Sequence, residues 1–265
     1  MLEISDLSCG YGTKIIINKI SLHIEKGEFI GIIGPNGSGK TTLLKAITHL
    51  IKPKNGRILL EGRDLHSTDK REIAKKMAVV SQNLPIVSMT VKEFVLLGRT
   101  PHYKTLQLFE NENDIEVVEH AMIMTGIKRL QNNLMSEISG GEIQLALIAR
   151  ALAQEPWILL LDEPTAHLDI THQVNILDLI KRLNKEYQLT VIIVLHDLNL
   201  ASEYCDRLVL MNNGQVSKMG TPEEVLNYVD LEEVYKTLVV VEKNPLSKKP
   251  FVLIVPEEVK KHCRR

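Results

Sequence analysis

The chain has 265 residues, a formal net charge of −1, 44% hydrophobic residues and 25% charged residues, which suits one large or two modest globular domains. The balanced charge and the aromatic content of only 4% disfavour nucleic acid and acidic lipid as partners. Three scattered cysteines form no C-x-x-C pair, so we expect neither a disulfide framework nor a zinc site, and a reducing compartment is the simplest setting.

No apolar run of the sequence approaches the roughly 18 residues of a membrane-spanning helix. The first six residues carry acids and alternate in polarity, so they do not resemble a signal peptide. We therefore expect that any work at a membrane depends on a partner that holds the chain there.

The N-terminal region reads as strands and turns. Alternating polarity predicts a half-buried strand from Leu2 to Leu7, followed by a turn over residues 9–12. Apolar runs predict two further strands at residues 15–17 and 20–24. Tyr11, in the expected turn, is a candidate for stacking on an adenine ring, although turn tyrosines are usually structural.

A phosphate-binding loop follows the apolar run at residues 29–33, which reads as a buried strand, and precedes apolar residues at helical spacing. The loop fits the pattern G-x-x-x-x-G-K-[ST] and consists of Gly34, Pro35, Asn36, Gly37, Ser38, Gly39, Lys40, Thr41 and Thr42. Its backbone N–H groups and the helix N-terminus are expected to hold the β- and γ-phosphates of a nucleotide. Lys40 supplies a cation for the same oxygens, Thr41 a hydroxyl for Mg²⁺, and Thr42 a contact to a neighbouring phosphate. The alternative is a glycine-rich turn that binds nothing.

The middle of the chain changes from strands to helices. Turn signals bracket a short strand at residues 57–60, a polar helix is expected from Asp69 to Lys76, and a buried strand over residues 77–81 ends at Gln82. A polar side chain at the carboxyl end of a parallel strand is placed to reach a ligand. From residue 85 to 136 strand patterns disappear. Helical patterns replace them at residues 91–97, 112–124 and 127–130, which indicates a helical insertion.

Two further segments are candidates for nucleotide chemistry. Ser139 is a plausible N-cap of a glycine-rich helix N-terminus, which is either a second anion site or an ordinary capped helix. The apolar run at 157–161 predicts a buried strand that ends in Asp162 and Glu163. Asp162 would hold Mg²⁺, and Glu163 would polarise the water that attacks the γ-phosphate. The alternative for this pair is two solvated loop acids.

The last third of the chain adds one more candidate. A buried strand at residues 190–195 delivers His196, which is placed to donate a hydrogen bond to the γ-phosphate. A hairpin at 207–218, helices to about Thr237 and two strands around Asn244-Pro245 follow. The basic residues 260–265 are expected to be a solvated end, with a contact to a membrane surface or a partner as the alternative.

The order of these motifs resembles the nucleotide-binding subunit of an ABC transporter. The resemblance implies roles for individual positions: Tyr11 stacks on adenine, Gln82 senses Mg²⁺, water and the transport subunit, and His196 is the switch histidine. It also implies that Asp169 lies in the loop that crosses a dimer interface. The signature that binds ATP across this interface spans Ser139, Gly140, Gly141 and Glu142.

The resemblance also implies the fold and its division. The expected fold is α/β, a P-loop (RecA-like) core with a mostly parallel sheet, an N-terminal antiparallel β subdomain and an inserted α-helical subdomain. The chain would form a single nucleotide-binding domain. Residues 1–84 and 151–230 would form the ATP-binding core, 85–150 the helical signature subdomain, and 231–265 a C-terminal extension.

The signature departs from the family's usual Leu-Ser-Gly-Gly-Gln at Ile138 and Glu142, and Ile143 stands where a basic or polar residue is common. Glu142 puts a carboxylate near a nucleotide and would weaken a ribose or phosphate contact unless it points away. A finer resemblance, at residues 97–102, 164–173 and 239–256, is to importers of iron–siderophore, haem and cobalamin complexes.

The implied function is ATP hydrolysis, with Mg²⁺, coupled to import through a membrane. Two copies would meet head-to-tail on the cytoplasmic face of the cell membrane, with permease subunits and, indirectly, an external substrate-binding protein as partners. No nucleic-acid partner is expected. The alternatives are another importer or an exporter, a soluble ABC ATPase that acts on DNA or ribosomes, and a nucleotide-binding regulator without turnover. The short interval between phosphate loop and signature, the single cassette, and the presence of Glu163 and His196 argue against the last two.

Overall fold

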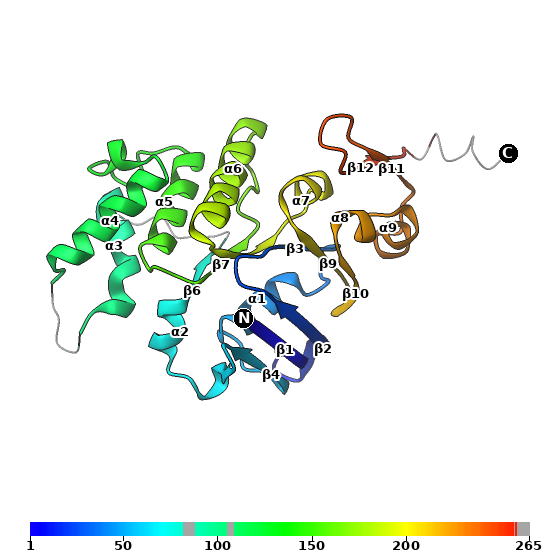
Figure 1. Cartoon of the computed structure of the whole chain (residues 1–265), viewed down its shortest axis with the longest axis horizontal. Coiled ribbons are helices and arrows are strands. Elements are labelled where there is room, and N and C mark those ends of the chain that lie inside the picture. Colours follow the sequence, from blue (N-terminus) through cyan, green and yellow to red (C-terminus); the bar gives the residue numbers. More distant parts are fainter. Residues whose placement is uncertain (82–87, 105–108, 257, 259–265) are drawn as a thin grey trace. The chain divides into compact units, whose positions relative to one another are not determined.

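The computed structural model in Figure 1 describes residues 1–81, 88–104, 109–256 and 258. The chain forms two compact units: unit 1 comprises Met1–His66 and Ile192–Arg265, and unit 2 comprises Ser67–Val191. Strands and helices occur in both units, which confirms the predicted α/β class.

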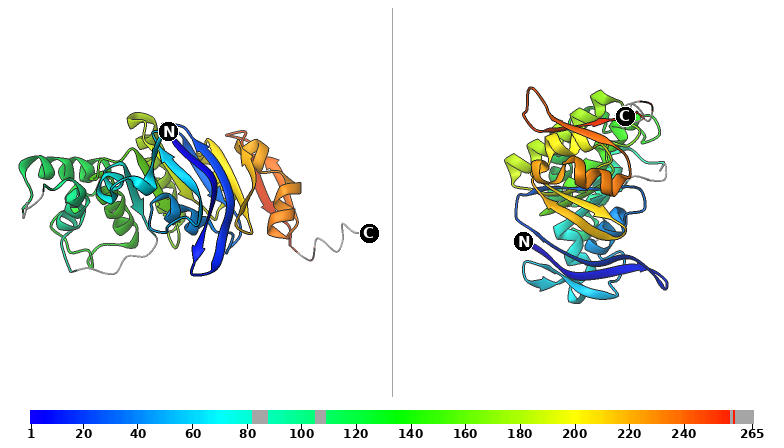
Figure 2. Two further views of the ribbon diagram at one scale, coloured as in Figure 1. Left: turned by 90° about the horizontal axis from the view of Figure 1, so that it is seen from below. Right: turned by 90° about the vertical axis from the view of Figure 1, so that its right-hand side faces the viewer.

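An antiparallel sheet opens unit 1, as predicted, and its long strands β1 and β2 lie side by side in Figure 2. In sheet order its strands are β2 (Lys14–Ile24), β1 (Leu2–Tyr11), β4 (Asn55–Leu60) and β5 (Arg63–Asp64). Leu2 and Ile4 on β1 are buried while Glu3 between them is exposed, so the strand has the period of two that a half-buried strand requires.

The turn expected over residues 9–12 lies later, at Gly12 and Thr13, because β1 continues to Tyr11, which pairs with Lys14 of β2. Gly10 explains the misreading. A Cβ at this position would lie 2.1 Å from the carbonyl oxygen of Lys14, so the glycine permits a close approach of two strands instead of a turn.

The two strands expected at residues 15–17 and 20–24 are a single strand, β2. The polar residues between the two apolar runs coincide with a register shift against β1, where Lys19 takes a left-handed φ of 52°. Such a bulge bends a strand and increases its twist without ending its pairing.

A second sheet of unit 1 carries the phosphate loop. Within this unit its strands are, in order, β10 (Gln215–Gly220), β9 (Arg207–Asn212), β3 (Phe29–Ile33) and β8 (Thr190–Val194). Only the last three residues of β8 belong to unit 1. Strands β3 and β9 are parallel, and β9 and β10 form the predicted hairpin. All five residues of β3 are buried, so the strand fixes the start of the loop within the core.

Short helices and a C-terminal hairpin complete unit 1. They are α1 (Lys40–Ile47), α7 (Leu198–Tyr204), α8 (Pro222–Val225), α9 (Tyr228–Tyr235), β11 (Val239–Lys243) and β12 (Pro250–Ile254). The helices after Thr221 and the two strands around Asn244-Pro245 are therefore confirmed.

Unit 2 is mostly helical around a parallel strand pair, β6 and β7. Its elements are α2 (Lys70–Lys76), β6 (Met77–Val80), α3 (Val91–Leu96), α4 (Glu112–Met124), α5 (Gly140–Leu152), β7 (Ile158–Asp162) and α6 (Ile170–Tyr187). The helices expected at 91–97 and 112–124 are confirmed, and Lys128–Leu130 forms a 3₁₀ turn within the third expected segment.

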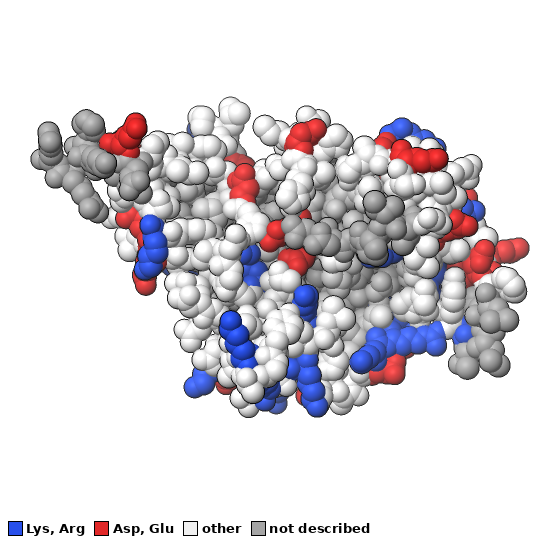
Figure 3. Space-filling view, turned by 180° about the vertical axis from the view of Figure 1, so that it is seen from behind, with Lys and Arg blue, Asp and Glu red and all other residues white. Residues whose placement is uncertain are grey.

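Acidic and basic side chains both occur over the face of the molecule drawn in Figure 3. This mixture agrees with the formal net charge of −1. Among the helices that lie within residues 1–81, 88–104, 109–256 and 258, none is both long enough and apolar enough to cross a membrane.

Candidate active site

The phosphate loop connects β3 to α1 in unit 1, and its glycines are required by the backbone. Gly34, Gly37 and Gly39 have φ values of 144°, 79° and 101°, which side chains rarely tolerate. A Cβ at Gly34 would also lie 2.3 Å from the carbonyl oxygen of Met211. The pattern that identified the loop in the sequence is therefore also what its conformation demands.

Lys40 and Ser38 give the loop the chemistry of an anion site. Lys40 is only 5% exposed, and its Nζ donates to the carbonyl oxygens of Gly34 at 2.9 Å and Pro35 at 3.1 Å. The Oγ of Ser38 is buried without a hydrogen-bond partner in the part of the chain that the structure describes. A buried cation, an unsatisfied hydroxyl and the N-terminus of α1 together fit a phosphate group.

Two residues that the sequence reasoning missed support this loop from elsewhere in unit 1. The N–H of Gly214, in the β9–β10 turn, donates to the Ser38 carbonyl at 3.0 Å, and the Gly214 carbonyl accepts from the Asn18 N–H at 2.9 Å. Burial raises the pKa of Tyr235 on α9 to about 12, against the opposing effect of a hydrogen bond with the backbone of Gly34. Tyr235 is therefore a neutral hydroxyl beside the loop at pH 7.

The other two candidates in unit 1 are exposed. Tyr11 is the last residue of β1 and is 51% exposed, so its ring presents a surface on which a base can stack. His196 follows β8 and is exposed. The next residue, Asp197, is the N-cap of α7 and accepts from the N–H groups of Asn199 and Leu200.

The two acids of unit 2 lie where the sequence predicted them. Asp162 ends β7, and Glu163 follows it with a left-handed φ of 53°. Both are partly buried. A non-glycine residue in this conformation costs on the order of 1 kcal/mol, and such strain persists where the surroundings enforce it. The Glu163 carbonyl accepts from the Ala166 N–H at 3.1 Å, and further along the loop the amide of Gln173 donates to the carbonyls of Thr165 at 3.2 Å and Leu168 at 3.0 Å.

Ser139 is the N-cap of α5, as predicted, and forms a reciprocal capping box with Glu142. The Ser139 N–H and Oγ donate to Oε2 of Glu142 at 3.0 and 2.9 Å, and the Glu142 N–H donates back to Oγ. Oε1 of Glu142 pairs with Arg129 at 2.7 Å. The bonds from Ser139, followed by Arg129, lower the pKa of Glu142. The Glu142 carboxylate, which departs from the family's signature, thus points back to the N-terminus of α5, and Arg129 balances its negative charge.

Asp169 is the N-cap of α6 and is joined to the signature helix by a residue that the sequence reasoning did not single out. His172 donates its backbone N–H to Asp169, and its ring Nδ1 lies 2.8 Å from the same carboxylate oxygen. Its ring also lies against Gly141, where an added Cβ would be 2.3 Å from Cδ2. The recurrence of histidine in the segment 164–173 was the available signal.

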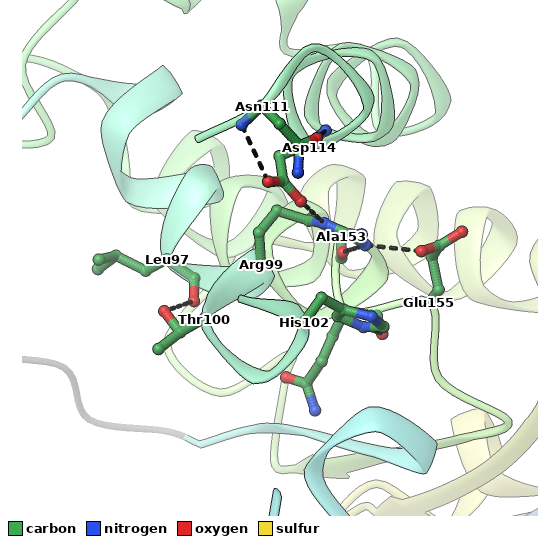
Figure 4. A network of polar contacts seen from close by, with 9 residues as sticks. Leu97, Arg99, Thr100, His102, Asn111, Asp114, Ala153 and Glu155 are labelled. Carbon is green, nitrogen blue, oxygen red and sulfur yellow. Dashed lines mark hydrogen bonds and ion pairs between the residues drawn. The ribbon is translucent and has the colours of Figure 1, made fainter. Parts of the chain in front are cut away.

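Residues 97–102 tie the helices of unit 2 together, and Figure 4 shows the polar contacts. Arg99 is 2% exposed and donates through Nε to Asp114 on α4 at 3.0 Å. Its Nη1 donates to the Ala153 carbonyl at the end of α5 at 2.7 Å and to Glu155 at 2.6 Å. This segment therefore has a structural role: it fixes the C-terminal end of the helix whose N-terminus carries the signature.

Some of the expected site lies outside the described residues, namely Gln82 and the basic residues 260–265. Within the described part of the chain, no group of three or more His, Cys, Asp or Glu side chains could hold a metal ion. Mg²⁺ as an ATP companion needs fewer protein ligands, because it keeps several waters and binds substrate phosphates. The residues expected to serve it are Thr41, at the start of α1 in unit 1, and Asp162, at the end of β7 in unit 2.

The sequence pattern of the family described as "ABC transporter" matches residues 17–166, more than half of the chain. The chain belongs to this family. As an ABC ATPase it shares 43% identity with the uncharacterized ABC transporter ATP-binding protein YvrA of Bacillus subtilis (strain 168), over 97% of this chain and 58% of that protein. It is 37% identical to the petrobactin import ATP-binding protein FpuC of Bacillus anthracis, over 98% of this chain and 94% of FpuC. It is also 37% identical to the ferric enterobactin transport ATP-binding protein FepC of Escherichia coli (strain K12), over 93% and 91%.

Solved structures agree on the ABC fold. An inward-facing ABC transporter described as of metal-chelate type aligns with a TM-score of 0.85 at 24% identity, over 97% of this chain and 98% of its own. The dimeric bacterial cassette MJ0796 aligns with a TM-score of 0.73 at 32% identity, over 83% and 98%.

Proposed function

We propose that this ABC ATPase is the ATP-hydrolysing subunit of a membrane importer for a metal chelate of the iron–siderophore, haem or cobalamin class. The observation that carries the proposal is the glycine-enforced phosphate loop with buried Lys40, in a chain similar along nearly its whole length to FpuC and FepC. Those two proteins are named for petrobactin import and ferric enterobactin transport.

Nucleotide binding is assigned to residues whose chemistry suits each part of ATP. The loop amides and Lys40 bind the β- and γ-phosphates, Thr42 contacts a neighbouring phosphate, and Tyr11 stacks on the adenine. Thr41 and Asp162 hold Mg²⁺, which supplies charge neutralisation when bound.

Hydrolysis is assigned to Glu163, which accepts a proton from the attacking water, with His196 donating a hydrogen bond to the γ-phosphate. Gln82 senses the ion and the water. Two copies are required, because one chain has one phosphate loop and one signature. Ser139, Gly140, Gly141 and Glu142 of each copy complete the site of the other across an isologous interface, to which Asp169 also contributes.

The proposal predicts a transport phenotype. In cells that lack the chain, uptake of radioactive iron chelates should be lost. Re-expressed wild type should restore it, whereas Glu163→Gln should not. Affinity purification from native membranes in mild detergent should recover a polytopic permease. Full chelate uptake in the absence of the chain, or recovery of ribosomes or DNA-associated proteins without a permease, would contradict the importer and leave only the ATPase.

The ion pair at the signature gives a second prediction. Without Arg129, the negative charge of Glu142 would lie beside the phosphates with no cation to balance it. Arg129→Ala should therefore raise the KM for ATP a few-fold, which is the size of effect expected from the loss of one exposed ion pair. Adding Glu142→Gln removes the charge and should restore the KM. Steady-state ATPase assays of wild type, Arg129→Ala and the double variant test this. An equal KM in wild type and Arg129→Ala would show that the pair of Arg129 and Glu142 does not affect nucleotide binding.

A further inference from the structure

We infer that His172 is a positioning residue that couples the two ATP sites of the dimer, by joining the loop after Glu163 to the signature helix of the same chain. The inference rests on the proposed function, in which Glu163 acts on the nucleotide held by its own chain and the signature acts on the nucleotide held by the partner copy.

The first contact orients the imidazole. Nδ1 of His172 lies 2.8 Å from Oδ1 of Asp169, and the backbone N–H of His172 donates to the same oxygen, also at 2.8 Å. A carboxylate oxygen can only accept, so Nδ1 carries the proton. The two bonds also lower the pKa of Asp169, which keeps the acceptor charged. The ring therefore cannot turn without breaking a bond to the N-cap of α6.

The second contact is with the signature helix. A Cβ built on Gly141 would lie 2.3 Å from Cδ2, 2.9 Å from Nε2 and 3.0 Å from Cγ of His172. The ring thus occupies the space that any side chain at this position would need. At the preceding Gly140 a Cβ would meet only Leu168, at 3.9 Å. Contact with His172 is therefore specific to the second glycine of the signature, which is buried at the first turn of α5.

The loop between these contacts is bonded to the start of α6. Gln173, the neighbour of His172, holds the carbonyls of Thr165 and Leu168. A displacement of the loop after Glu163 is thus transmitted to residues 169–173 and, through the ring, to Gly141. Because loop and signature serve different nucleotides in a head-to-tail dimer, this linkage lets the state of one site bias the other.

The test is the ATP dependence of hydrolysis by the full-length chain. Wild type is expected to show a Hill coefficient above 1 and up to about 2, the number of sites. His172→Ala should lower the coefficient to about 1, with binding of a fluorescent ATP analogue by the dilute monomer unchanged. His172→Phe keeps a ring without the bond to Asp169, and His172→Asn keeps a donor without the ring. Both should also lose cooperativity, because both contacts are required. His120→Ala, at an exposed histidine of α4, is the matched control and should behave as wild type.

Three outcomes would overturn the inference. A wild type that hydrolyses ATP with a Hill coefficient of 1 has no coupling to explain. A His172→Ala chain that keeps the wild-type coefficient does not need the ring, even if its rate falls. A Hill coefficient preserved in His172→Asn would show that His172 acts only through its bond to the N-cap residue Asp169, and that the contact of its ring with Gly141 is not needed. By contrast, a wild-type chain that does not hydrolyse ATP would contradict the proposed function itself.

Discussion

Replacing Glu163 by glutamine is expected to slow ATP hydrolysis by at least about a hundredfold while leaving ATP binding intact, because a positioned general base contributes about 10² to 10⁴ to the rate. Glutamine has nearly the same shape but cannot accept the proton of the attacking water. Glutamine can adopt the same backbone conformation, and the Gln173 amide bonds to the Thr165 and Leu168 carbonyls are made without residue 163, so the loop should keep these contacts.

The Glu163→Gln chain should also accumulate as a dimer in the presence of ATP, since ATP binding brings two copies together and the slow hydrolysis leaves them associated. Phosphate release in a single turnover measures the rate, and light scattering after size exclusion measures the mass with and without ATP. Glu186→Gln, at an exposed glutamate of α6, is the control and should hydrolyse ATP normally. Normal turnover by Glu163→Gln would remove this residue from the reaction and leave the chemical step without an assigned base.

The secondary structure of this chain was largely predictable because its elements carry local signals. The helix over residues 112–124 has its capping residue, Asn111, directly before it, and the run at 190–195 forms a strand from Thr190 to Val194. Gly10 shows where such signals fail. Glycine marks both turns and close approaches of two backbones, and only the position of the neighbouring strand distinguishes them.

The candidate site divides in the same way. Its proposed chemical groups lie in short contiguous motifs, which the sequence displays directly. Their supports are long-range: Gly214 holds Ser38, Tyr235 reaches Gly34, and the ring of His172 fills the space beside Gly141. No spacing rule connects such pairs, because the fold and not the local chain brings them together. The partners of Glu142 are of the same kind: its bond to Arg129, thirteen residues earlier in the chain, follows from the fold and not from the signature itself.

Truncation of Arg99 is expected to destabilise unit 2 strongly. Arg99→Ala removes three hydrogen bonds and the guanidinium that pairs with Asp114, which is equally buried. Breaking a buried ion pair by removing one partner destabilises a protein by about 3–5 kcal/mol, since the remaining charge has been taken out of water. Urea unfolding followed by fluorescence of Trp157, which lies in the same unit, should report this loss.

Two further variants separate the electrostatic cause from loss of packing. Arg99→Lys retains the positive charge, but its single ammonium group cannot reach all three acceptors as the planar guanidinium does. The stability of this variant should therefore lie between those of the alanine variant and wild type. Arg99→Met with Asp114→Leu removes both charges while filling the space, and well-packed apolar pairs often replace buried ion pairs without cost. It should recover only part of the loss, because Asp114→Leu also removes the acceptor of the Asn111 N–H at the start of α4. Lys75→Ala, which breaks an exposed pair with Glu72, should change stability little. If Arg99→Ala stayed within about 1 kcal/mol of wild type, the segment 97–102 would not hold α4 and α5 together, and the anchoring of the signature helix would have to lie in its apolar face alone.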